Sequence, residues 1–326
     1  MKQIGLGLLA VLLLYGGSSQ AQVYDAATIT TTEFAALDRG KTAVIIPGGI
    51  LEEHGPYLPS NTDGLLANWL SKELAAQVAK RRGWSVLLLP EITLGHSGAN
   101  DIGRRFTFPG SITVRAATLR SVYMDVADSL QSHGFKWVFL VHIHGAPLHN
   151  QMLDKVSDYF TEMSGGRMVH LMGLAAVENC CSWKEAADPQ AVAEDGFTVH
   201  AGVSESSRLM FVSPEAVKPE IAQAPSVTGK DFADLVRIAG QPDWPGYFGA
   251  PRFASPETGE RVMRAQAAKL GEIASAILDG NEWPQERFHV EGSMDPEDVK
   301  ISRATEAVDA AAAKRQQKWL ARRKRK

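Results

Sequence analysis

Two carboxylates and an imidazole lie close together on one glycine- and proline-rich stretch, residues 49–63. It reads Gly-Ile-Leu-Glu-Glu-His-Gly-Pro-Tyr-Leu-Pro-Ser-Asn-Thr-Asp and includes Glu52, His54 and Asp63. Glu52 and His54 are two residues apart, so in an extended chain their side chains point to the same side. Carboxylate and imidazole groups are suitable ligands for zinc, manganese and similar divalent ions. The stretch therefore predicts part of a metal site, although Asp63 at a helix start could equally be a helix cap.

Further candidates occur in two later segments. His142 and His144 alternate directly after an apolar run, and the following Gly145 permits a ligand to approach closely. Glu205 stands at an expected helix start, shortly after His200. A single histidine here can be a satisfied core residue, and an acid at a helix start complements the helix dipole. Taken one at a time, these residues do not decide between a metal site and an ordinary structural role.

The order of the apolar segments predicts the elements that position these residues. Short aliphatic runs predict strands at 42–47, 86–90, 137–141 and 167–172. Apolar stripes at helical spacing predict helices at 62–82, 116–133, 148–163, 205–212 and 257–278. This alternation predicts an α/β layered fold with a largely parallel sheet. Ligands of such sheets gather at the C-terminal ends of strands, where Glu52, His54 and His144 stand.

Together, the three segments resemble the creatininase family of metal-dependent amidohydrolases. The likeness rests on Glu52-x-His54-Gly55-Pro56-x-Leu58-Pro59-x-x-Thr62-Asp63, Phe108-Pro109-Gly110-Ser111, His144-Gly145, His200-Ala201-Gly202 with Glu205-Ser206-Ser207, and Gly249-x-Pro251-x-x-Ala254. These blocks stand in the family's order. The resemblance implies a three-layer α/β/α sandwich with a largely parallel central sheet, often assembled into homo-hexamers. It also implies hydrolysis of a non-peptide C–N bond, such as that of a small cyclic amide.

The resemblance implies a role for each candidate. Asp63 would bridge two divalent ions, with Glu52 and His144 on one ion and His54 and Glu205 on the other. The ions would be zinc, manganese or ferrous iron. His200 would be the catalytic residue, as a substrate contact or proton carrier. A hydroxide held between the ions would be the nucleophile, and imidazole is suited to deliver a proton to the leaving nitrogen.

The chain departs from the family pattern at several positions. Tyr57 stands where family members commonly carry a histidine, and Val203 stands where they carry an acid. The run His142 to Pro147 replaces an Asn-Gly-His-Gly-Gly-Asn sequence. Ala146 occupies the place of a glutamate that true creatininases carry. Creatinine itself is therefore not the expected substrate.

Other side chains can compensate for these changes. Glu205 is the natural substitute for the glutamate ligand that is absent at Ala146, and Asn150 or His149 can replace the missing asparagine. No Gly-x-Ser-x-Gly elbow or glycine-rich phosphate loop competes for a catalytic role.

Two alternatives remain open. One is a peptidase-like or deformylase-like member of the same family, in which Trp183, Trp244 and residues 175–195 would line or cover the pocket. Trp183 could equally be a buried aromatic residue with a paired indole nitrogen. The other is a non-catalytic periplasmic binding protein on the same fold, because folds outlive functions.

The chain ends predict export and a separate C-terminal extension. Lys2, an apolar run of about 12 residues and the Ser-Gln-Ala sequence ending at Ala21 predict a signal peptide over residues 1–21. The run is shorter than the roughly 20 residues of a membrane-spanning helix. The expected location is therefore periplasmic or secreted, with no stable membrane insertion after cleavage. Residues 22–290 would form the hydrolase domain and 291–326 the extension.

The net charge, the basic tail and the cysteines of the chain indicate few binding partners. The formal net charge is only -3, and the basic tail from Arg322 to Lys326 is typical of a solvated, disordered end, so no nucleic-acid partner is expected. Cys180 and Cys181 are the two cysteines of the chain. Their adjacency excludes a CxxC metal motif, and in an oxidising compartment they can form a vicinal disulfide.

Overall fold

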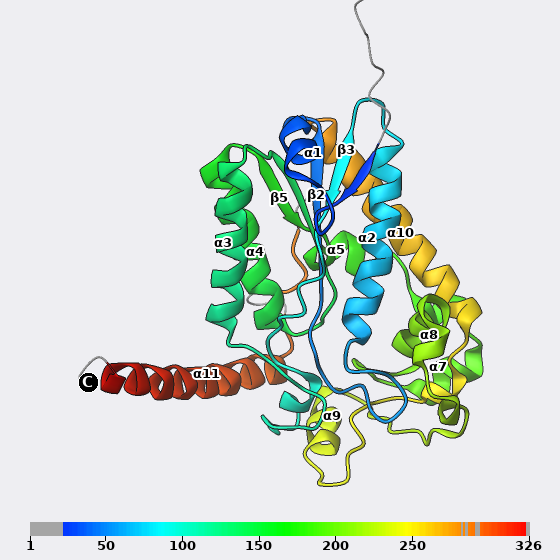
Figure 1. Cartoon of the computed structure of the whole chain (residues 1–326). Coiled ribbons are helices and arrows are strands. Elements are labelled where there is room, and N and C mark those ends of the chain that lie inside the picture. Colours follow the sequence, from blue (N-terminus) through cyan, green and yellow to red (C-terminus); the bar gives the residue numbers. More distant parts are fainter. Residues whose placement is uncertain (1–21, 282, 284–285, 291–293, 324–326) are drawn as a thin grey trace, which may run out of the picture.

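The computed structural model describes residues 22–281, 283, 286–290 and 294–323, and its centre is a parallel sheet (Figure 1). The strand order is β1-β3-β2-β4-β5. In that order the strands are Val23–Asp25, Ser85–Leu88, Thr42–Gly48, Trp137–His142 and Arg167–His170. Every pairing is parallel, and the long strands β2 and β4 lie at the centre. The predicted α/β fold with a parallel sheet is confirmed.

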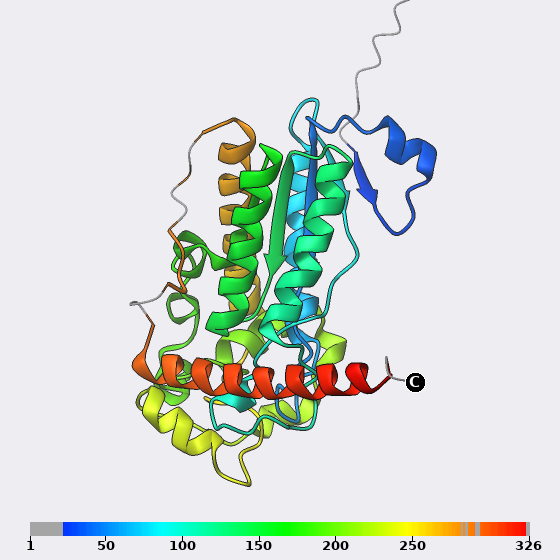
Figure 2. The ribbon, with the colours of Figure 1, turned by 90° about the vertical axis from the view of Figure 1, so that its left-hand side faces the viewer.

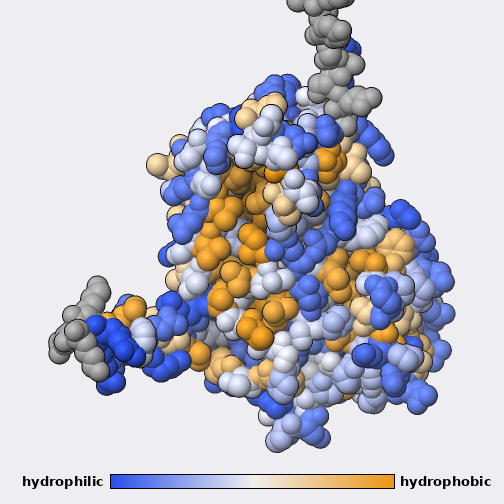
Figure 3. All heavy atoms as spheres, in the orientation of Figure 1, coloured by the Kyte–Doolittle hydropathy of each residue, from blue (hydrophilic) through white to orange (hydrophobic). Residues whose placement is uncertain are grey.

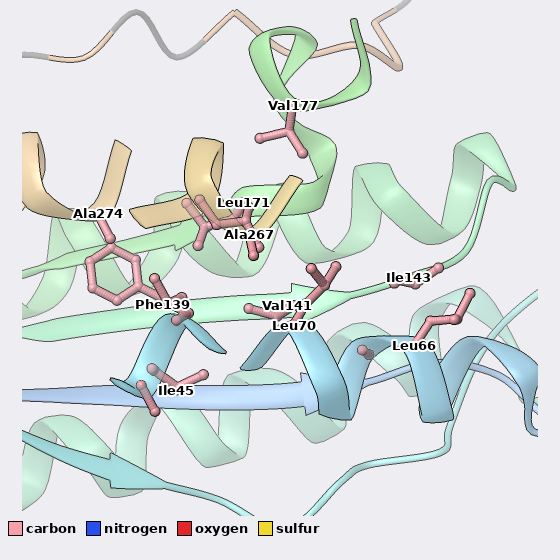
Figure 4. Packing of buried hydrophobic residues seen from close by; sticks show 14 of the residues in the cluster. Ile45, Leu66, Leu70, Phe139, Val141, Ile143, Leu171, Val177, Ala267 and Ala274 are labelled. Atoms are coloured by element: carbon pink, nitrogen blue, oxygen red, sulfur yellow. The ribbon is translucent and has the colours of Figure 1, made fainter. Parts of the chain in front are cut away.

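Alternating side chains of β2 divide the core into two layers. Ala43 and Ile45 pack with α2 (Thr62–Ala79), α8 (Val203–Val212) and α10 (Pro256–Leu278). Figure 4 shows part of this cluster around Ile45 and Phe139. On the opposite face, residues of β2 and β4 pack with α1 (Thr31–Ala36), α3 (Ala116–Ser132) and α4 (Pro147–Ser164). Because side chains of a strand alternate between faces, both faces of a buried parallel strand must be apolar, and the result is a three-layer sandwich.

Short elements fill the loops at the C-terminal edge of the sheet. The α-helices there are α5 (Ala175–Glu178), α6 (Trp183–Ala186), α7 (Pro189–Asp195) and α9 (Phe232–Ala239). The 3-10 helices are η1 (Ala99–Asp101), η2 (Leu171–Gly173), η3 (Pro214–Ala216), η4 (Pro219–Gln223) and η5 (Pro251–Phe253). None of the described helices is long and apolar enough to cross a membrane.

The C-terminal extension forms one long helix, α11 (Pro296–Arg323). Figures 1 and 2 show α11 lying across the lower ends of α3 and α4 and projecting past them. The projecting part is mostly hydrophilic, with a small hydrophobic patch near its end (Figure 3). The prediction of a disordered tail is wrong for Arg322 and Arg323, which continue the helix; an alanine-rich sequence with cations in its last turn favours helix.

Several predictions about the chain ends fall on other residues. The predicted signal peptide, residues 1–21, and the last three residues of the basic tail lie outside the described residues. The boundary at residue 290 between the hydrolase domain and the extension stays a prediction. Cys180 and Cys181 are joined in a vicinal disulfide, as the sequence allowed.

Candidate metal centre

The predicted site residues meet at the C-terminal ends of the two central strands. Glu52 and His54 follow β2, Asp63 stands in the first turn of α2, and His144 follows β4. Glu205 lies in the first turn of α8, which packs against α2. Parallel central strands bring these loops to one edge of the sheet, as the sequence predicted.

Asp63 lies between two histidines. Its Oδ2 is 3.3 Å from Nδ1 of His144, and its Oδ1 is 3.6 Å from Nε2 of His54. His144 Nδ1 is also 3.1 Å from Oε1 of Glu52, and His54 Nε2 is 3.7 Å from Oε1 of Glu205. The two oxygens of one carboxylate thus face two separate pairs of side chains. Asp63 does not act as the helix cap, because Asn61 occupies that position.

His54 and His144 each direct one ring nitrogen at a backbone carbonyl oxygen. His144 Nε2 is 2.8 Å from the oxygen of Ser97, and His54 Nδ1 is 3.2 Å from the oxygen of Glu52. A carbonyl can only accept, so each of these nitrogens carries the proton. The opposite nitrogen of each ring is directed at the carboxylates. This arrangement of a carbonyl behind the ring and a nitrogen facing acids in front is typical of histidines that bind metals.

The donor set fits divalent cations. Three groups have ligand atoms within 4.8 Å of one another: Glu52, Asp63 and His144; His54, Asp63 and Glu205; and Glu52, His54 and His200. Nε2 of His54 and Oδ2 of Asp63 are buried and lack a hydrogen-bond partner among the described residues. Buried polar atoms normally have partners. A cation between the carboxylates and the inner nitrogens of the two histidines would satisfy these atoms.

The carboxylates of the cluster also favour positive charge at the site. Burial lowers the pKa of His54, but Glu205, Asp63 and Glu52 outweigh it, so the pKa lies well above its ordinary value. Burial also lowers the pKa of His144, but Glu52 and Asp63 outweigh it, so this pKa likewise lies well above its ordinary value. Burial raises the pKa of Glu52, but His144 and His200 outweigh it and lower the pKa to about 2. The acids thus favour protonated histidines, and a cation bound between the same groups would have to displace these protons.

His200 is buried beside the other residues of the cluster. Its Nε2 donates to the carbonyl of Glu53 at 2.6 Å, and its Nδ1 is 3.8 Å from Glu52 Oε1 and 3.9 Å from Glu205 Oε2. Its ring centroid is 4.4 Å from that of His54. Burial and the charge of His54 lower the pKa of His200, although Glu52 and Glu205 raise it. The geometry therefore admits His200 as a ligand as well as a proton carrier.

Backbone groups that sequence reasoning missed orient the acids. The N–H of Ala99 donates to Oε2 of Glu52 at 2.8 Å, and the N–H of Ala201 donates to Oε2 of Glu205 at 2.7 Å. Buried Asp195 accepts from the N–H of Val203, the first residue of α8, at 3.0 Å and so fixes the start of that helix. Such contacts depend on which loops meet in space, and no local pattern in the sequence reports them.

The residues proposed as replacements lie beside the cluster rather than in it. His142 is buried behind it, and its Nδ1 is 2.9 Å from Nε2 of His149. The His149 ring lies at an angle to that of His144, with centroids 4.9 Å apart. Asn150 donates to the carbonyl oxygens of His144 and Ala146 at 2.8 and 3.0 Å. Asn150 and His149 therefore support the loop of His144 and are not in its carboxylate cluster.

The two tryptophans suggested as pocket residues differ in their surroundings. Trp244 is buried, and its indole nitrogen donates to the carbonyl of Tyr247 at 2.9 Å, so it has the structural role. Trp183 begins α6 and is partly exposed. It stays a candidate substrate contact.

Comparisons with known proteins show the family of the chain. The family model described as creatinine amidohydrolase matches residues 27–274. Creatinine amidohydrolase of Pseudomonas putida is 23% identical over 244 residues, which cover 72% of this chain and 90% of that protein. Mycofactocin precursor peptide peptidase of Mycobacterium ulcerans (strain Agy99) is 29% identical over 180 residues, 54% of this chain and 60% of that protein.

Solved structures show the same fold. A proposed creatinine amidohydrolase of Bacteroides fragilis NCTC 9343 has a TM-score of 0.58 at 24% identity, covering 79% of this chain and 98% of that one. A manganese form of creatininase has a TM-score of 0.57 at 22% identity, covering 78% and 98%. A creatininase mutant of the zinc type has a TM-score of 0.56 at 22% identity, covering 78% and 97%. With the family model matching most of its length, the chain belongs to the creatininase family and is a metal-dependent amidohydrolase.

Proposed function

We propose that this protein hydrolyses a small non-peptide amide with two divalent ions, held by Glu52, His54, Asp63, His144 and Glu205. The observation that carries the proposal is the position of Asp63, whose two oxygens face His144 and His54 separately. Each of these histidines has a second carboxylate beside it, Glu52 or Glu205. This is the arrangement expected if Asp63 bridges two ions.

Zinc and manganese are the proposed ions, with ferrous iron as a further candidate. Imidazole and carboxylate ligands suit all three. Zinc and manganese forms of creatininase share this fold. Ions bound here would supply an activated water and polarise the carbonyl of the substrate.

The chain itself supplies orientation and proton transfer. Asp63, Glu52 and Glu205 fix the charges at the site, and the carbonyls behind the histidines fix the tautomers. Nε2 of His200 is engaged with Glu53, so Nδ1 is the atom left to exchange a proton with the leaving nitrogen. We assign His200 this role, because its Nδ1 lies 3.8 and 3.9 Å from carboxylate oxygens of the proposed ligands Glu52 and Glu205.

The burial of the cluster supports a small substrate. Glu52, His54 and Asp63 are 2%, 2% and 1% exposed, whereas the Glu205 side chain is 21% exposed and marks the open side. The similarity to a creatinine amidohydrolase supports a cyclic amide. Ala146, in place of the expected glutamate, argues for a compound other than creatinine.

A peptide end is the second candidate substrate. It is favoured by the similarity to mycofactocin precursor peptide peptidases, one of which is 29% identical to this chain over its matched part. The proposed ions and ligands would be the same. Only the residues around the open side of the site would differ.

A substrate screen separates the two candidates. The purified protein, loaded with zinc or manganese, would be given cyclic amides, formamides and short peptides, and the loss of substrate and the products formed would be measured. We expect turnover of a cyclic amide that is abolished by a chelator. Cleavage of peptides alone would favour the peptidase, and no turnover of any class by metal-loaded protein would favour a binding protein.

Export and assembly are further parts of the proposal. A signal peptide over residues 1–21 would direct the protein to the periplasm or out of the cell. A homo-oligomer, such as a hexamer, is expected from the family resemblance. Fractionation and light scattering of the exported protein test these two points.

A further inference from the structure

The segment from His96 to Ala99 orients two residues of the metal centre through its backbone. The carbonyl oxygens of His96 and Ser97 lie 3.2 and 2.8 Å from Nε2 of His144. The N–H of Ala99 donates to Oε2 of Glu52 at 2.8 Å. The segment thereby fixes the tautomer of His144 and the rotation of the Glu52 carboxylate. Groups in this position commonly determine how tightly a metal is bound.

This segment does not belong to a strand or a long helix that could hold it in place. It follows β3, which ends at Leu88, and it ends at Ala99, the first residue of the short helix η1. Ser97 has a φ of 65°, in the left-handed region that residues with a side chain rarely adopt. Such a conformation persists only where surrounding contacts impose it. Neighbouring elements must therefore hold the segment.

Helix α11 supplies these contacts from outside. Oδ2 of Asp309 is 3.1 Å from Nε2 of His96 and 2.9 Å from the backbone nitrogen of Ala116, the first residue of α3. Ile301, one of the buried residues of α11, packs in the same apolar cluster as Ala99. The helix therefore contacts the segment through Asp309 and shares an apolar cluster with it through Ile301. Figure 2 shows α11 crossing the end of α3 where these contacts occur.

The polar contact joins His96, which is buried on the side of the metal centre, to Asp309, which is partly exposed. The side chain of His96 is 3% exposed, and that of Asp309 is 24% exposed. The backbone N–H of His96 also donates to Nδ1 of His149, whose ring lies beside His144. A shift of His96 would consequently be felt at His144 through two routes. One is the carbonyl oxygen and the other is the His149 ring.

We propose that Asp309 is a positioning residue for the metal centre: by holding His96, it fixes the segment that orients His144 and Glu52. This inference rests on the metal function proposed above. Helix α11 lies beyond residues 27–274, the part of the chain that the family model matches. The C-terminal extension would thus complete the centre from outside the matched region.

Cobalt binding tests the proposal without knowledge of the substrate. Co²⁺ would be titrated into metal-free Asp309→Ala and wild-type protein, with the dissociation constant and the visible spectrum recorded. We expect binding to weaken about tenfold or more, the usual effect of removing a group behind a metal ligand. Both contacts of Asp309 use one oxygen, so Asp309→Asn keeps an acceptor and should restore most of the affinity.

Two further variants keep the test decisive. Glu306→Ala removes an exposed acid from the same helix and should bind Co²⁺ like the wild type. His96→Phe removes the imidazole donor, should reproduce the loss, and should add little to Asp309→Ala. It also replaces Asp309→Ala as the test variant if the latter does not fold.

The outcomes separate the inference from the function on which it rests. If Asp309→Ala and His96→Phe melt at lower temperature but keep the wild-type cobalt affinity and spectrum, the contact is merely structural and the inference is overturned. If wild-type protein itself takes up no Co²⁺, zinc or manganese, the proposed metal function fails and the inference fails with it.

Discussion

Asp63 is the residue on which the metal centre depends most. Its side chain is buried, and its two oxygens face histidines that approach from different segments of the chain. A carboxylate in this position would neutralise charge on the two proposed ions and would set the distance between them. The neighbouring acids, Glu52 and Glu205, each face only one of these histidines at close range.

Replacing Asp63 by asparagine should therefore abolish turnover more completely than any other single change of a proposed ligand. The side chain keeps its size, but an amide is uncharged and a poorer ligand for divalent ions. Metal analysis of the dialysed Asp63→Asn protein should find that the binding of both ions is weakened. Two tightly bound ions and a normal rate would show that Asp63 does not bridge.

His200→Ala should have the opposite signature. As a proton carrier, His200 would contribute about a hundredfold or more to the rate, the usual size of a general acid-base effect. The protein should still bind two ions, because the five proposed ligands remain. Metal content and rate are measured on the same sample, and loss of an ion would assign His200 as a ligand instead.

At this scale the sequence predicted residues that the structure brings together, but not the backbone groups behind them. The proposed ligand residues stand directly after strands or in the first turns of helices, where their position along the chain fixes their place in the fold. The carbonyls of Ser97 and Glu53 and the N–H of Ala99 contribute backbone atoms that every residue has. No residue type signals them, so they could only be found from the structure.

The site most constrains the packing of strand β2 and of the loop that follows it. The last residue of β2, Gly48, pairs with His142 of β4 beneath the cluster. A Cβ on Gly48 would overlap the ring of His142 and come within 2.8 Å of the hydroxyl of Tyr123, two fully buried side chains. The absence of a side chain here lets the two central strands and the histidine pack together.

Gly48→Ala should consequently lower the free energy of unfolding, by about 1–3 kcal/mol, as overpacking of a core does. Gly145→Ala is the matched control, because nothing lies within 4 Å of a Cβ built there. It should change stability by no more than about 0.5 kcal/mol. Denaturant titration of both variants measures the difference, and equal stability of the two would contradict this view of the strand packing.

The elements with a strong apolar pattern were predictable from the sequence, and the others were not. The predicted helix 257–278 and strand 137–141 differ from α10 and β4 by one residue at one end. Strand β1 has only three residues, and α11 buries little of its surface, chiefly at Ile301 and Thr305. Neither has the repeated apolar positions on which sequence prediction depends.

As a whole molecule, the chain is a family domain with additions at both ends. The family model begins at residue 27, and the described structure begins the sheet with β1 at Val23. At the other end, α11 extends the chain beyond the matched residues and returns Asp309 to the segment behind the metal centre. The additions are therefore connected to the domain by contacts and not only by the chain.

The mature exported protein should begin near Gln22. Cleavage after Ala21 would follow the Ser-Gln-Ala sequence and would leave β1, which starts at Val23, intact in the sheet. N-terminal sequencing of protein from the periplasmic fraction or the medium gives the answer directly. A retained Met1 in that fraction would contradict the predicted signal peptide.

The central claim is that this chain holds divalent ions and uses them for hydrolysis. Elemental analysis of the purified protein, repeated after chelation together with an activity assay on the substrate found by screening, tests it most directly. We predict about two equivalents of zinc, manganese or iron per chain, loss of activity with loss of metal, and recovery when the metal is restored. A folded, metal-free protein, or one whose activity survives complete removal of metal, would contradict the claim.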